Sequence, residues 1–213
     1  TPYADNVPDY LTPRIRLRDN TIPTSRYGYN MPKETVEKLR SIVDGMLDVG
    51  IIIPTTSPWN SPIFVKITGG DIKDGAITPQ KLHPLFDYRE VNKKVIPVVS
   101  TEPHCADLIK SLGPARLFSK MDILRGFWTM KIHPNDQNIL AFTFENRQYC
   151  PTRWPFGLNN SPAYFSHALR ILFRDFLLHP GTHLYVDDQC IADSDFEEHL
   201  KTLSLLFDIA RHY

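Results

Sequence analysis

The chain has 213 residues, 42% of them hydrophobic, and its 24 Lys and Arg balance 24 Asp and Glu to a formal net charge of +0. This length and apolar content predict one domain, or two interleaved ones, with a real core. No apolar run approaches the ~20 residues of a membrane span, and residues 1–19 are too polar for a signal peptide. Three widely spaced cysteines favour a reducing compartment over a disulfide framework.

Residues 1–29 carry four prolines and little periodicity, and we interpret them as an extended arm. Apolar residues at helical spacing predict a helix over residues 31–50. Residues 51–67 contain too much proline for a helix and predict strand, turn, strand. The glycines of residues 68–80 predict a loop, and residues 81–99 predict a strand that runs into a turn.

The second half of the chain begins with a short predicted strand, residues 116–122, that ends on Asp122. Three more strands are predicted at residues 128–134, 139–146 and 147–154. A helix, a hairpin and a closing helix follow at residues 161–178, 182–193 and 194–213. Ser194 and Glu197 have the spacing of a capping box. These elements predict an α+β fold, with helices on an antiparallel sheet.

Charge is distributed unevenly along the chain. Residues 61–100 contain six Lys or Arg against four acids, whereas residues 181–200 contain six acids and no Lys or Arg. A neutral total argues mildly against a nucleic-acid-binding protein. An acidic patch is often only solvated surface, and it becomes a site only if its carboxylates converge.

Two interpretations of the acids at the hairpin remain open on the residues alone. Asp187 and Asp188 at a hairpin tip are ordinary turn residues. If the hairpin instead adjoins the strand that ends on Asp122, three carboxylates converge and require a cation between them. Mg²⁺ prefers such oxygen ligands, and Mn²⁺ is a workable substitute. Two such ions ~3.5–4 Å apart would serve nucleotidyl transfer.

Five segments resemble the sequence blocks of reverse transcriptases, in the order of that family. They are "TSPWNSPIFVKI", "LFDYREVNKKV", "LFSKMDILRGFWTMKIHP", "WPFGLNNSPAYFSHAL" and "YVDD". The resemblance runs from about residue 14 to residue 210. The segment "PFGL", with Phe156, resembles the polymerases of gypsy-type LTR retrotransposons. Retroviral enzymes usually have Gln at the position of Phe156.

The resemblance implies the right-hand polymerase fold, with fingers and palm only and an antiparallel palm sheet backed by helices. After the arm of residues 1–29, the fingers would comprise residues 30–98 and 131–154. The palm would comprise residues 99–130 and 155–213. Thumb, connection and RNase H are absent from this sequence, so the chain would be either a fragment of a longer Pol polyprotein or a cut-down relative of these enzymes. The isolated fragment is expected to be weak or inactive, because primer–template affinity depends on phosphate contacts spread along the duplex.

The resemblance also implies the catalytic residues. Asp122, Asp187 and Asp188 would hold two Mg²⁺ ions, with the backbone carbonyl of Ile123 as a further ligand. Phe127 stands where the family has an aromatic gate that rejects a ribose 2′-OH. The alternative for Phe127 is an ordinary core aromatic.

Nucleotide-binding residues follow in the same way. The backbone of Arg125 and Gly126 would cradle the triphosphate, and Phe156 would line the nucleotide pocket. Lys73 is either a γ-phosphate contact or a solvated loop lysine. His83 stands where the family has an arginine, and it lacks the bidentate, permanently charged fork of that side chain. Lys81 is a candidate substitute as a point charge.

Template and primer contacts would come from Asp87, Arg89, Asn92, Gly157 and Tyr185. The template contacts would go largely to backbone and 2′-OH groups, since sequence is read by base pairing. Tyr185 would pack near the primer end.

The implied function is an RNA-directed DNA polymerase that transfers dNTPs to a primer 3′-OH on an RNA or DNA template, without a membrane partner. One alternative is a catalytically silent module that binds RNA or protein, which His83 favours and the three aspartates oppose. An RNA-templated RNA polymerase is disfavoured by Phe127. The expected location is a cytoplasmic virus-like particle, or the nucleus, and no oligomeric state is predicted.

Overall fold

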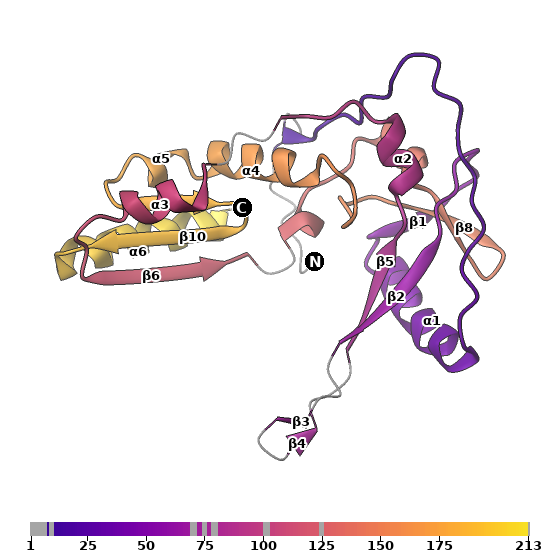
Figure 1. Cartoon of the computed structure of the whole chain (residues 1–213), viewed down its shortest axis with the longest axis horizontal. Helices are drawn as coiled ribbons and strands as arrows, with labels where there is room; N and C mark the ends of the chain where they lie inside the picture. The colour runs from indigo at the N-terminus through magenta and orange to yellow at the C-terminus, as the bar shows by residue number, and fades with distance from the viewer. Residues whose placement is uncertain are drawn as a thin grey trace. The chain divides into compact units, whose positions relative to one another are not determined.

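The computed structural model describes residues 8, 11–68, 72–73, 76–77, 81–99, 103–123 and 126–212 (Figure 1). It divides into two compact units. Unit 1 consists of Thr1–Thr12, Pro97–Met130 and Asn160–Tyr213. Unit 2 consists of Pro13–Ile96 and Lys131–Asn159. The naming of segments as fingers and palm remains a prediction.

Unit 1 is built on an antiparallel sheet with the strand order β6-β10-β9. Its strands are β6 (Leu117–Asp122), β9 (Thr182–Tyr185) and β10 (Asp188–Asp193). Its helices are α3 (Cys105–Ser111), the 3₁₀ helix η2 (Gly126–Thr129), α4 (Ser161–Leu172), α5 (Arg174–Leu177) and α6 (Phe196–His212).

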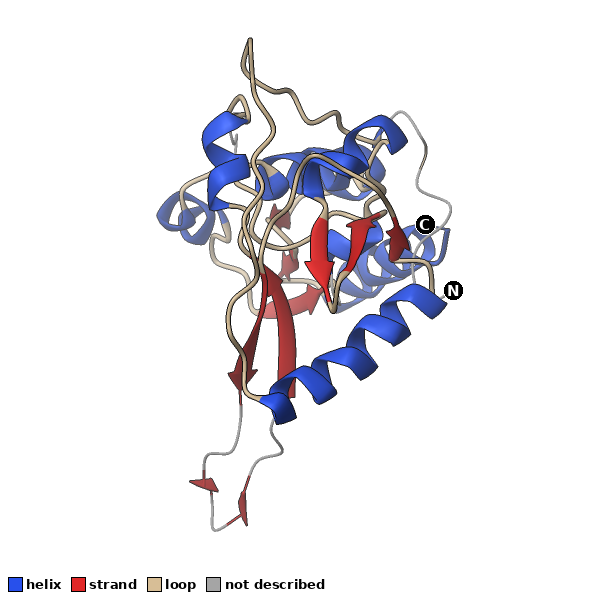
Figure 2. Ribbon diagram, turned by 90° about the vertical axis from the view of Figure 1, so that its right-hand side faces the viewer, coloured by secondary structure: helices blue, strands red, loops and turns tan. Residues whose placement is uncertain are grey.

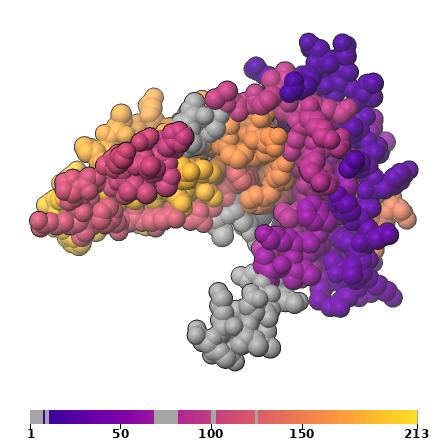
Figure 3. Space-filling model, viewed as in Figure 1, coloured from indigo at the N-terminus to yellow at the C-terminus, as the bar shows by residue number. Residues whose placement is uncertain are grey.

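A buried polar chain joins α6 to this sheet. His199 on α6 is 6% exposed; its Nδ1 lies 3.0 Å from Asp193 Oδ2 and its Nε2 lies 2.8 Å from Ser119 Oγ. Ser119 is on β6 and Asp193 is on β10, so one side chain connects the helix to two strands. Segments distant in sequence therefore pack together, as the rose atoms of β6 and the yellow atoms of the C-terminal segment show in Figure 3.

Unit 2 contains one three-stranded sheet and two two-stranded ladders. The sheet has the order β1-β8-β7, and the ladders are β2-β5 and β3-β4, all antiparallel. The strands are β1 (Ile52–Pro54), β2 (Ile63–Thr68), β3 (Ile72–Lys73), β4 (Ala76–Ile77), β5 (Lys81–Phe86), β7 (Phe142–Phe144) and β8 (Arg147–Pro151). The helices are α1 (Lys33–Asp48), α2 (Arg89–Lys94) and the 3₁₀ helix η3 (Pro134–Leu140).

Aromatic side chains form the centre of unit 2. The rings of Phe86 and Phe142 have centroids 4.8 Å apart, and Phe86 also stacks on Tyr88 at 5.6 Å. The long helix α1 packs beside β5 (Figure 2), and its residues Leu39 and Val43 are buried. This core holds β5 and the residues that follow it, Asp87 and Arg89.

Most long elements match the sequence predictions. The predicted helix over residues 31–50, the strand ending on Asp122, the hairpin and the closing helix are confirmed as α1, β6, β9–β10 and α6. The predicted helix over residues 161–178 is interrupted at Phe173 (φ −98°, ψ 22°), which separates α4 from α5. No helix in the described part of the chain is long and apolar enough to cross a membrane.

The prediction of a strand over residues 128–134 is wrong. Trp128, Met130 and Ile132 are buried at alternate positions, which imitates a strand, but the backbone there begins in η2 and forms only an isolated bridge between Lys131 and Arg153. The strand predicted at residues 139–146 shrinks to β7, because residues 134–140 form η3.

Other differences are local. The short helices α2 and α3 were not predicted, and the predicted loop of residues 68–80 contains the short β3 and β4. The predicted capping box is displaced by one residue: Asp195 Oδ1, not the Ser194 hydroxyl, accepts the backbone N–H, which comes from Glu198 at 2.9 Å. Asp is as good an N-cap as Ser, so the pattern alone could not choose between neighbours.

Candidate active site

A two-residue turn presents the acids of the hairpin. Asp188 on β10 pairs with Tyr185 on β9, which leaves Val186 and Asp187 as the turn. Val186 has φ +57°, a conformation that β-branched residues rarely adopt. The carbonyl of Asp187 accepts a 3.3 Å hydrogen bond from the N–H of Ile123. The turn is therefore tied directly to the end of β6.

The strand register brings the predicted acids to one end of the sheet. Asp188 lies opposite Asp122 in the β10–β6 ladder, and directly opposed residues in an antiparallel pair point to the same face. Asp122 is exposed, whereas Asp187 and Asp188 are half-buried. The adjoining strands that the metal-site interpretation required are therefore present.

Lys120 also belongs to this end of the sheet. Its Nζ lies 2.8 Å from Asp188 Oδ2. The hydrogen bond from Lys120 to Asp188 and the charge of that carboxylate raise the pKa of Lys120, and Asp122 and Asp187 add to the effect. The three carboxylates therefore make the potential at this end negative, and the Lys120 ammonium partly neutralises it.

The side chains are not arranged as a ligand group. Among the residues that the structure describes, no three His, Cys, Asp or Glu side chains are grouped so that they could hold a metal ion. The donor chemistry nevertheless fits a hard divalent cation, since Asp122, Asp187 and Asp188 all offer carboxylate oxygens. The metal site remains a prediction.

Gly126 and Phe127 lie on η2 under the ring of Phe165. A Cβ on Gly126 would be 2.5 Å from Phe165 Cζ, so a larger residue at this position would force the buried Phe165 ring to shift. The rings of Phe127 and Phe165 meet edge to face at 5.2 Å. The N–H of Gly126 donates to the carbonyl of Ile123 at 3.2 Å, so these two predicted ligand groups bond to each other here.

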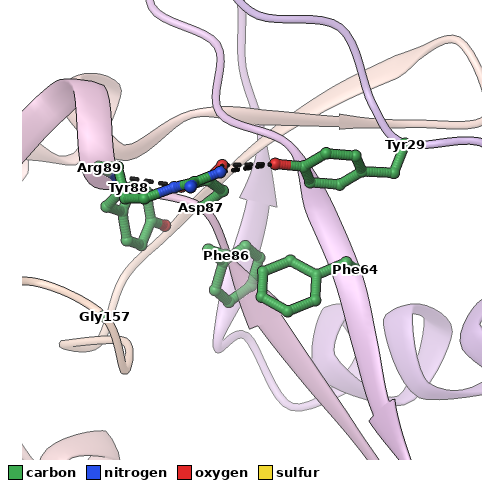
Figure 4. Close-up of a pocket in the computed structure, with 7 residues that line it drawn as sticks. All are labelled: Tyr29, Phe64, Phe86, Asp87, Tyr88, Arg89 and Gly157. Carbon is green, nitrogen blue, oxygen red and sulfur yellow. Dashed lines mark hydrogen bonds and ion pairs between the residues drawn. The ribbon is translucent and has the colours of Figure 1, made fainter.

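Unit 2 contains a pocket of about 500 Å³ built around Asp87 (Figure 4). It is lined by Tyr29, Phe64, Phe86, Asp87, Tyr88, Arg89 and Gly157. The Arg89 Nε and Nη2 atoms lie 2.8 and 2.7 Å from the two Asp87 oxygens, and the Tyr29 hydroxyl donates to Oδ2 at 2.6 Å. Arg89, and then Tyr29, hold the pKa of Asp87 well below its usual range against the opposing effect of burial.

Tyr29 is the residue of this cluster that the sequence did not reveal. It lies at the end of the segment interpreted as an extended arm, 58 residues from Asp87. Its ring also meets Phe64 edge to face at 5.9 Å. No local pattern links residues so far apart.

Asn92 braces the loop that follows the "PFGL" segment. Its Nδ2 donates to the carbonyl of Gly157 at 2.8 Å, and its Oδ1 accepts from the N–H of Asn159 at 3.0 Å. Gly157 has φ +101°, and a Cβ there would be 3.1 Å from the Phe86 carbonyl oxygen. Both ends of the Asn92 amide are thus engaged, while Phe156, the residue before Gly157, is 41% exposed.

The remaining predicted residues are less constrained. His83 is exposed on β5, with Nε2 2.9 Å from Thr68 Oγ1. Tyr185 is 37% exposed. Arg125 and the side chains of Lys73 and Lys81 lie outside the described part of the structure.

Solved structures that share this fold include foamy virus enzymes. The foamy viral protease-reverse transcriptase in complex with RNA/DNA hybrid superposes with a TM-score of 0.77 and 29% identity, over 94% of this chain and 26% of that one. The same enzyme with double-stranded DNA gives 0.76 and 31%, over 92% of this chain and 33% of that one. The predicted α+β polymerase fold is confirmed.

Related sequences are retroviral and retrotransposon polyproteins. The Gag-Pol polyprotein of Gibbon ape leukemia virus is 32% identical over 98% of this chain, and the Pol polyprotein from transposon 412 of Drosophila melanogaster is 28% identical over 94%. This chain spans only 12% and 16% of those polyproteins. A family profile described as "Reverse transcriptase (RNA-dependent DNA polymerase)" matches residues 72–213. The chain belongs to the reverse transcriptase (RNA-dependent DNA polymerase) family, as its sequence blocks predicted.

Proposed function

We propose that this chain supplies the catalytic acids of an RNA-directed DNA polymerase, which adds dNTPs to a primer 3′-OH on an RNA or DNA template. The observation that carries the proposal is the β10–β6 register, which sets Asp188 opposite Asp122 with Asp187 in the adjoining turn. The foamy viral relative in complex with an RNA/DNA hybrid supports a primer–template as the partner.

Asp122, Asp187 and Asp188 would hold the divalent cations, with the Ile123 carbonyl as a further ligand. Bound Mg²⁺ supplies charge stabilisation at the attacking and leaving oxygens of phosphoryl transfer. The chain itself contributes position: the tight turn and the bond from Ile123 to the Asp187 carbonyl fix the acids relative to β6. The turn and Ile123 thus hold the three carboxylates in place before a cation binds.

Phe127 would select deoxynucleotides. Its ring is held edge to face by Phe165, whose own side chain is 1% exposed and cannot move aside easily. A ring fixed in this way rejects a 2′-OH sterically. Replacing Phe127 with Val should therefore admit ribonucleotides, and unchanged discrimination would assign the ring to the core alone.

Arg89 is the residue of unit 2 best suited to contact a template. Its side chain is 73% exposed, although two of its nitrogens are bonded to Asp87. The cluster therefore holds a guanidinium at the surface in a fixed orientation, which suits backbone contact. Triphosphate binding is expected to be weaker than in relatives with an arginine at position 83, because His83 offers no bidentate fork.

The test is primer extension on an RNA template with Mg²⁺ and dNTPs. The 213-residue chain and a version extended past Tyr213 with the next part of its polyprotein should be compared, each with and without Asp187→Asn. We expect extension by the longer protein, and its loss in the variant. If the longer protein adds no nucleotide and still binds RNA, the chain is a silent binding module and the enzyme proposal is wrong.

A further inference from the structure

Lys120 lies on the same face of the sheet as the acids. It precedes Asp122 by two residues on β6, and alternate residues of a strand share a face. Asp188 is opposite Asp122, which makes Lys120 its diagonal neighbour, and the two side chains form an ion pair at 2.8 Å. The Lys120 side chain is 67% exposed and that of Asp188 is 33% exposed. The pair is thus open to solvent and to ions.

A carboxylate that already binds an ammonium must release it, or share it, to bind a metal ion. The positive charge of Lys120 also repels any cation that approaches Asp122 or Asp187, since these carboxylates share the end of the sheet. Lys120 therefore opposes metal binding in two ways, by occupying Asp188 and by reducing the negative potential.

We propose that Lys120 competes with a divalent cation for the carboxylate of Asp188 and so sets the metal concentration at which the acidic end of the hairpin is loaded. This inference rests on the proposed function, because it requires the three aspartates to bind metal. Its consequence is that removing the lysine charge strengthens metal binding and does not weaken it.

The test is a Mn²⁺ titration of the 213-residue chain, followed by the electron paramagnetic resonance signal of free Mn²⁺. Lys120→Met should lower the Kd about 3- to 10-fold, the effect of removing one charge at short range in a solvated site. Lys120→Arg keeps the charge and should leave the Kd near that of the unmodified chain.

The matched control is Lys201→Met. Lys201 is 71% exposed and pairs with Glu198 on α6, in the same unit. Its replacement should not change the Kd. Circular dichroism should show that all variants keep the fold, as expected for exposed side chains.

Two failures are distinguishable. An unchanged or higher Kd for Lys120→Met, in a chain whose Mn²⁺ binding is abolished by Asp187→Asn, overturns the role of Lys120 and leaves the metal site standing. Failure of the unmodified chain to bind Mn²⁺ in a manner sensitive to Asp187→Asn overturns the proposed function and this inference together.

Discussion

Asp87 in unit 2 and Asp188 in unit 1 each pair with a basic residue, but the two carboxylates are held differently. The Asp87 side chain is 5% exposed and accepts bonds from two Arg89 nitrogens, the Arg89 N–H and the Tyr29 hydroxyl. The Asp188 side chain is 33% exposed and meets the flexible ammonium of Lys120. A carboxylate saturated by fixed donors is a structural support, whereas one held by a single mobile cation can exchange that cation for another.

The sharpest test of this contrast replaces one carboxylate oxygen at the acidic end of the unit 1 sheet and compares it with a second Asp of the same unit. Asp187→Asn should reduce primer extension by the extended protein at least about 100-fold, because even residues that only orient a metal ligand contribute 10–100-fold. Its melting temperature should stay close to that of the unmodified chain, since the side chain is half-buried at a turn. Asp208→Asn on α6, where Asp208 is 70% exposed, is the control. A melting temperature that falls sharply in Asp187→Asn would show that this acid is structural after all.

The support role of the unit 2 cluster predicts a strong effect at Gly157. Gly157→Ala should destabilise the protein by about 1–3 kcal/mol, because a side chain at φ +101° is strained and its Cβ would press on the Phe86 carbonyl. Gly28→Ala is the matched control, since a Cβ there meets nothing within 4 Å. Chemical denaturation of both variants measures the difference, and equal stabilities would contradict a rigid loop at Gly157.

The saturated carboxylate should also be visible as acid sensitivity. The pKa of Asp87 is lower in the folded chain than in the unfolded chain, so its stabilising effect is complete above about pH 4 and declines as the pH falls below that value. Melting temperatures measured between pH 7 and pH 3 should therefore fall more steeply for the unmodified chain than for Asp87→Asn. Parallel curves would mean that Asp87 has an ordinary pKa.

The smallest expected effect concerns the cap of α6, the helix that supports the unit 1 sheet. Asp195→Ala should cost about 1 kcal/mol, because Asp195 accepts the N–H of Glu198, while Ser194→Ala should cost little. Denaturant midpoints of the two variants decide between the observed cap and the capping box expected from the sequence. A larger loss for Ser194→Ala would favour the latter.

The sequence revealed the hairpin, β6 and the long helices because each is defined by a local period. The convergence of the acids could then be predicted, since the alternation of side chains along β6 and β10 sets which residues share a face. The alternate burial of Trp128, Met130 and Ile132 led to a wrong prediction of a strand, because these residues do not lie in one. Periodicity reports which residues are buried, and it identifies a strand only where a neighbouring strand completes the ladder.

The parts of the site that escaped prediction depend on distant contacts. The link from Tyr29 to Asp87, the ring of Phe165 above Gly126 and the Lys120–Asp188 pair each join segments more than 35 residues apart. A sequence block can indicate that a glycine or lysine belongs to a site. It cannot say that the glycine packs directly against a phenylalanine ring, or that the lysine is already paired with one of the acids.

The two-residue turn at Val186 and Asp187 limits how this hairpin can evolve. Inserting or deleting one residue there would shift the β9–β10 register, so either β9 would turn its side chains to the opposite face or β10 would turn Asp188 away from Asp122. Point replacements are tolerated more easily, and at Val186 the strained φ of +57° would be relieved by glycine or asparagine. Related chains should therefore differ in residue type at the position of Val186 while keeping the length of the turn.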